Sequence, residues 1–115
     1  MNTEKVTHVF GALNTLEKTV KVSEKMIKDN HIKSNGIDSA IFQQKKFLSE
    51  MRRAANKLQL EICKKDFAGA ARSYQTFYGL NSIVRPEILT TYRIVANQEK
   101  VEEVYAKKVN KRVLH

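Results

Sequence analysis

Three histidines and one cysteine are the residues of this chain best suited to nucleophilic or metal chemistry. They are His8, His31, His115 and Cys63. A bound metal needs three or four ligands at fixed spacing, and a nucleophile needs a base beside it. The histidines show neither an H-x-x-x-H nor an E-x-x-H spacing, and a single thiol cannot build a zinc cluster. We therefore expect no catalytic residues, no metal site and no cofactor.

Basic side chains form the second pattern that could have a function, because they could bind a charged partner. Lys and Arg number 21 against 12 Asp and Glu, so that the net charge is +9 and the isoelectric point is close to 9.8. Such an excess suits a polyanion such as nucleic acid, whose phosphates bind Lys and Arg. Basic residues also surround the apolar anchors of protein interfaces. Both partner classes stay open, a protein or a nucleic acid, whereas we expect no small-molecule substrate.

The densest basic pattern lies between residues 38 and 65. When this segment is projected as a helix at about 100° per residue, four cations fall on one side, opposite the apolar positions. No acidic residue shares that side, but two large apolar residues do. We predict that this face contacts a partner, and its candidate residues are Phe42, Lys46, Arg53, Lys57, Leu60 and Lys64. The four cations among them are also candidates for binding a polyanion.

A second cluster of this kind ends the sequence. Near residues 97–100 the apolar positions move to a nearly opposite helical face, which predicts either a break or an extended helical tail over about 98–115. An apolar stripe on such a tail needs a partner, and another copy of the chain is the simplest one. The candidate partner-binding residues of the tail are Val101, Val104 and Tyr105. Its candidate polyanion-binding residues are Lys107, Lys108, Lys111 and Arg112.

Helices are the elements that must position these residues. The chain has only four glycines and one proline in 115 residues, and residues that favour helices are plentiful. Over residues 3–29 apolar positions recur with a 3-4 spacing, which predicts a long amphipathic helix. A turn at 35–36 should end this pattern, and a second long helix should begin at a cap on Asp38 or Ser39 and run to about residue 65. The two helices should form an antiparallel hairpin.

The rest of the chain predicts two further helices. A short one is expected over residues 67–78, capped by Asp66 and closed by Gly79, because glycine suits the left-handed residue after a helix. Pro86 fits the first position of a fourth helix that should run to about Arg112, because proline lacks the amide proton that this position does not use.

The segment of residues 66–77 resembles the second helix of a tetratricopeptide repeat. An acidic residue and an aromatic one are followed by alanines and then by further aromatic residues. The resemblance implies a repeat-like helical hairpin. One repeat cannot stack into a solenoid, however, and Lys57 stands where the preceding helix of the repeat has a leucine. We therefore expect an ordinary close-packed helix.

These patterns predict an all-α protein in which residues 1–115 form a single helical domain with one hydrophobic core. The expected fold is a four-helix assembly with two long antiparallel helices, one short helix and one long C-terminal helix. No stretch approaches the roughly 18 apolar residues that span a bilayer. The polar N-terminus and the lone Cys63 favour a cytoplasmic protein without a membrane partner.

The functional expectation is a protein that binds and does not catalyse. The first interpretation is a small non-enzymatic helical interaction or scaffolding protein that self-associates and holds a protein partner. The alternative is a basic helical protein associated with nucleic acid, which binds backbone phosphates without reading the bases. No motif of a known nucleic-acid-binding fold decides between them.

Overall fold

The computed structural model describes the backbone of residues 3–113 and the side chains of residues 3–98. The described chain forms three helices, and no strand occurs within it: α1 (Thr3–Asp29), α2 (Asn35–Cys63) and α3 (Phe67–Val113). The all-α prediction is confirmed. The prediction of four helices is wrong, because the expected third and fourth helices are one continuous helix.

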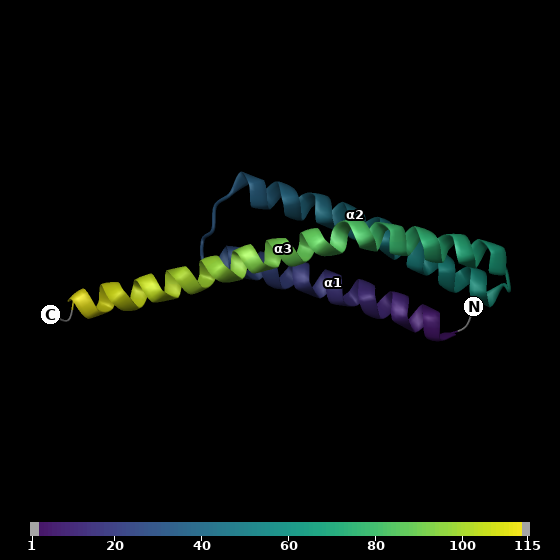
Figure 1. The fold of residues 1–115 in the computed structure, drawn as a ribbon, viewed down its shortest axis with the longest axis horizontal. Coiled ribbons are helices and arrows are strands. Elements are labelled where there is room, and N and C mark those ends of the chain that lie inside the picture. Colours follow the sequence, from purple (N-terminus) through teal and green to yellow (C-terminus); the bar gives the residue numbers. More distant parts are fainter. Residues whose placement is uncertain (1–2, 114–115) are drawn as a thin grey trace.

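The three helices run up, down and up again (Figure 1). The short connections make α2 antiparallel to both of its neighbours, and each helix contacts the other two. The α3 helix has 47 residues, against 27 in α1 and 29 in α2. Its C-terminal part continues past the end of the other two helices, which gives the molecule extents of 72 × 26 × 17 Å.

The α2 helix begins earlier than the sequence predicted. Ser34 has an extended backbone and its Oγ accepts a hydrogen bond from the amide of Ile37 at 3.2 Å, so Ser34 is the N-cap. The expected caps Asp38 and Ser39 lie inside the helix. Residues 35–36 form its first turn because a serine that caps from outside satisfies one of the first helical amides.

The α3 helix begins where it was predicted to begin. The Asp66 carboxylate accepts a hydrogen bond from the amide of Gly69 at 3.0 Å, which confirms Asp66 as a helix cap. Gly69 is also a point of close approach, because a Cβ there would overlap Oε2 of Glu61 and Oδ2 of Asp66. Glu61 in turn accepts a hydrogen bond from the Ser73 hydroxyl, which ties the end of α2 to the first turns of α3.

Neither Gly79 nor Pro86 interrupts α3. No glycine of the described chain has a positive φ, so Gly79 is an ordinary helical residue and not a terminator. Pro86 lies inside the helix and is exposed. The physical reason is packing: buried positions follow a helical spacing straight through both residues. These positions are Ala70, Ser73, Phe77, Val84, Ile88, Thr91 and Val95.

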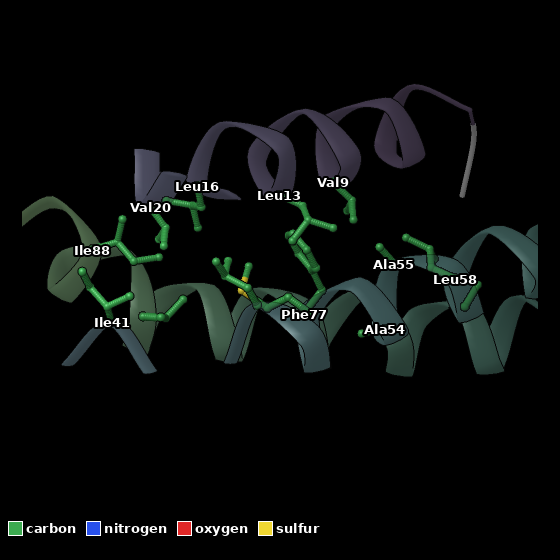
Figure 2. Packing of buried hydrophobic residues seen from close by; sticks show 14 residues of the cluster. Val9, Leu13, Leu16, Val20, Ile41, Ala54, Ala55, Leu58, Phe77 and Ile88 are labelled. Carbon is green, nitrogen blue, oxygen red and sulfur yellow. The ribbon is translucent and has the colours of Figure 1, made fainter. Parts of the chain in front are cut away.

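The core fills the space between the three helices along most of the bundle (Figure 2). Each helix contributes one apolar stripe. Phe77 is the largest fully buried side chain and points from α3 toward α1. The labelled core residues come from α1 (Val9, Leu13, Leu16, Val20), α2 (Ile41, Ala54, Ala55, Leu58) and α3 (Phe77, Ile88).

One buried polar contact joins α2 to α3. The Gln44 side chain is 1% exposed, and its Nε2 donates to Oγ1 of Thr91 at 2.9 Å and to the carbonyl oxygen of Glu87 at 3.4 Å. Gln44→Ala is expected to lower the free energy of unfolding by about 2–3 kcal/mol, through a cavity and a lost hydrogen bond. Urea denaturation followed by circular dichroism measures this loss.

The paired substitution Gln44→Leu with Thr91→Val is the control for that prediction. It removes both polar partners and preserves most of the volume, so its cost should stay below about 1 kcal/mol. A loss in the pair as large as in Gln44→Ala would contradict the assignment of this contact.

Candidate interaction surfaces

The predicted face of α2 is solvent-exposed along its length. Phe42 and Leu60 are 57% and 59% exposed, which is unusual for side chains of this size. The cations of the face are exposed as well, and they are Lys46, Arg53, Lys57 and Lys64. The structure does not gather all six residues into one site, because they are distributed from the first turns of α2 to its end.

The two ends of this face differ in their contacts. Near the start of α2, Nζ of Lys46 lies 4.8 Å from the centre of the Phe42 ring, in a cation–π contact. At the other end, Lys64 is the C-cap residue of α2, and its amide donates to carbonyl oxygens of the last turn. Lys46 and Lys64 therefore each take part in a contact within α2 itself. The middle of the face is left as the candidate for binding a partner.

The middle of the face borders a groove between α2 and α3. The groove has a volume of about 490 Å³ and includes Arg53 and Lys57 from α2. It also includes Arg72 from α3, which the sequence analysis missed. Its full lining is Glu50, Arg53, Ala54, Lys57, Arg72, Ser73, Thr76 and Leu80.

The signal for Arg72 was present in the short connection between the predicted second and third helices. Residues 57 and 73 are equally distant along the chain from residue 65, at the connection between α2 and α3. In an antiparallel pair of helices such residues lie opposite each other. Folding the predicted short helix back onto α2 would therefore have placed Arg72 beside Lys57.

A second group of charges lies between α1 and α2, and here the charges pair. Arg52 binds the Glu17 carboxylate, and its Nη2 donates to Oδ1 of Asn14 at 2.9 Å. Lys45 binds Glu24 at 2.7 Å. Both ion pairs join different helices and are partly exposed. Each adds at most about 1 kcal/mol, so they set the register of the α1–α2 hairpin more than its stability.

The outer side of α3 carries exposed apolar residues. Ile83 and Ile94 are 53% and 50% exposed, and Tyr92 is partly exposed nearby. The candidate side chains of the predicted tail lie outside the described residues, although their backbone belongs to α3. They are Val101, Val104, Tyr105, Lys107, Lys108, Lys111 and Arg112.

An aromatic cluster joins the start of α1 to α3. The ring centres of Tyr74 and Tyr78 are 4.8 Å apart, and Nζ of Lys5 lies 5.4 Å from the centre of the Tyr74 ring. Burial raises the pKa of Tyr78 above its ordinary value, and the charge of Tyr74 and a hydrogen bond with it add to this effect. Both rings pack against the core, which makes the cluster a structural contact.

Within the part of the chain whose side chains are described, no group of three or more His, Cys, Asp or Glu residues is arranged to hold a metal ion. None of the described helices is both long and apolar enough to cross a membrane. Comparison with known proteins found no match to the chain among family models, curated proteins or solved structures.

Proposed function

We propose that this chain is a small non-enzymatic interaction or scaffolding protein of the cytoplasm, which self-associates through the extension of α3 and holds a protein partner on the outer face of α2. The observation that supports this proposal is the length of α3. At about 1.5 Å per residue, its 47 residues extend about 70 Å, against about 41 and 44 Å for α1 and α2. The C-terminal part therefore has no neighbour within its own bundle (Figure 1).

A helix without neighbours is a weak structure in water. Isolated helices shorter than about 12–15 residues are marginal, because most helical stability in proteins comes from packing of an apolar face. The sequence of the extension contains Val101, Val104 and Tyr105 at helical spacing. Packing of this stripe against a second helix would stabilise the extension.

The register of α3 supports the same interpretation. Ile94 follows Ile83 by about three helical turns and position 101 follows it by about five, so the three positions share one side of the helix. Ile83 and Ile94 are both half exposed. A second copy of the chain would provide the same apolar pattern, which is the requirement for a symmetric helical pair.

Nucleic-acid association is the second candidate, and the net charge of +9 supports it. Binding through phosphates releases counterions and therefore weakens steeply as salt rises, whereas an apolar helical interface persists. Because the chain has no Trp and four Tyr, a small amount of bound nucleic acid would dominate its absorbance at 260 nm. One purification therefore separates the two candidates.

Size-exclusion chromatography with light scattering, at low and high salt, tests the proposal. We expect a dimer or larger species that resists salt and shows no excess absorbance at 260 nm. The double variant Val104→Ser with Tyr105→Ser should elute as a monomer, because it removes apolar contacts of about 1.5–3 kcal/mol per side chain.

Val22→Ser with Phe67→Ser is the matched control. Both residues are exposed on the bundle, so this variant makes similar chemical changes away from the extension and should keep the assembly of the natural chain. A monomeric natural chain, or an unchanged assembly in the α3 variant, would refute self-association through α3. A 260 nm signal that disappears at high salt would move the nucleic-acid candidate to first place.

A further inference from the structure

The groove between α2 and α3 is lined by three cations that form no ion pair with any carboxylate of the described residues. Arg53, Lys57 and Arg72 line it, whereas the ion pairs found among the described residues belong to Lys45 and Arg52 on the other side of α2. Glu50 is the one acidic residue of the lining. Three cations from two helices therefore give this groove a positive field that a ligand with carboxylates would neutralise.

The same groove has apolar side chains between its cations. Ala54 is 7% exposed and Leu80 is half-buried, and both line the groove. An apolar strip with cations beside it, between two adjacent helices, matches the groove into which an amphipathic helix lays its apolar face.

We propose that the groove between α2 and α3 binds an acidic amphipathic helix of a partner protein. Its apolar face would cover Ala54 and Leu80, and its carboxylates would pair with Arg53, Lys57 and Arg72. This inference rests on the proposed function in one respect, that the chain binds a protein, and it names a surface distinct from the α3 extension.

Charge complementarity selects this occupant over a second copy of the chain. The chain carries an excess of nine positive charges. The carboxylates of Glu17 and Glu24, on α1, are already paired with α2. A second copy therefore approaches the groove with a net positive charge, which the three cations repel.

The lining of the groove also favours a peptide over nucleic acid. Single-stranded nucleic acid binds where aromatic side chains stack on bases, and no aromatic residue lines this groove. Phosphates gain no binding free energy from contact with the apolar strip. The leucines and alanines of an amphipathic helix gain it by burying their apolar surface there.

The test is fluorescence anisotropy with the full chain and a labelled synthetic helical peptide. The peptide carries leucine and alanine on one face and glutamates on both flanks, and a second peptide has glutamine in place of each glutamate. We expect the acidic peptide to bind and the glutamine peptide to bind about tenfold more weakly or worse, because three ion pairs at a partly desolvated groove are lost.

Two variants and one matched control locate the site. The charge reversal Arg53→Glu, Lys57→Glu and Arg72→Glu should weaken binding of the acidic peptide by about tenfold or more. Its matched control makes the same change in net charge at exposed lysines elsewhere and should bind like the natural chain: Lys18→Glu, Lys25→Glu and Lys33→Glu. Thr76→Trp fills the groove without changing charge and should weaken peptide binding as strongly as the reversal.

The outcomes separate this inference from its competitors. No binding of the acidic peptide, or equal binding by the charge reversal and its control, overturns the inference. If a single-stranded oligonucleotide binds tighter than the peptide and Thr76→Trp leaves both unchanged, the cations serve phosphates and the inference is also wrong. The Val104→Ser with Tyr105→Ser variant should bind the peptide like the natural chain. The peptide experiment therefore tests the groove even if the chain does not self-associate.

Discussion

Phe77→Ala is expected to lower the free energy of unfolding by about 3–5 kcal/mol, which is a large part of the roughly 5–15 kcal/mol that stabilises a small domain. Phe77 is fully buried and is the largest of the buried side chains. It comes from α3 and lies among core residues of all three helices (Figure 2). Its removal leaves a cavity that three rigid helices cannot close. Urea denaturation followed at 222 nm measures the shift of the midpoint.

Phe67→Ala is the matched control for this prediction. The same atoms are removed from the same helix, but Phe67 is 53% exposed and contributes less burial. Its cost should stay below about 1 kcal/mol. Similar losses at the two positions would mean that α3 does not pack on the bundle through the face that carries Phe77.

Pro86→Ala is expected to raise the stability of the protein, by as much as about 3 kcal/mol. Proline in a helix interior removes the hydrogen bond to the carbonyl of the residue four positions earlier, here Ser82, and its ring crowds that carbonyl. Pro86 and Ser82 are both exposed, so alanine restores the hydrogen bond without disturbing the core. Thermal unfolding by circular dichroism should show a higher midpoint.

Gly79→Ala should add about 0.5–1 kcal/mol to that gain, because glycine loses more chain entropy in a helix than alanine does. A Cβ at Gly79 meets nothing within 4 Å. The positions lie about 10 Å apart along the helix, so the two effects should add. If either substitution destabilises the protein, then α3 is broken at that residue in solution, as local sequence preference predicts.

Gly79 and Pro86 show where local sequence signals stop being informative. The first helix, the hairpin and the Asp66 cap follow from spacing and capping chemistry that act within a few residues. The continuity of α3 follows instead from burial of Phe77, Val84 and Ile88, which depends on two other helices. Packing of this kind offsets an unfavourable proline, and only a test of the apolar spacing across the apparent break would have predicted it.

The candidate surfaces show the same division. Exposure of Phe42, Arg53 and Lys57 was predictable, because the opposite face of α2 is apolar. The grouping of Arg53 and Lys57 with Arg72 was not, since it depends on how α3 folds back. Periodicity assigns a residue to a face of its own helix, and the tertiary structure decides which faces meet.

The continuity of α3 has a mechanical consequence. The α3 helix is held inside the bundle at one end and projects from it at the other, so it acts as a lever arm. A small rotation of the part inside the bundle produces a larger displacement of the C-terminal end. Pro86 marks the position where bending is easiest, because the helical hydrogen bond is missing there. The part of α3 beyond Val95, the last buried residue described, follows such a bend, and a tilt of about 10° there would move the C-terminal end by about 5 Å, given a rise of about 1.5 Å per residue. A small change of packing around Val84 and Ile88 would thus displace the C-terminal end of α3, and any partner bound to it, far outside the core.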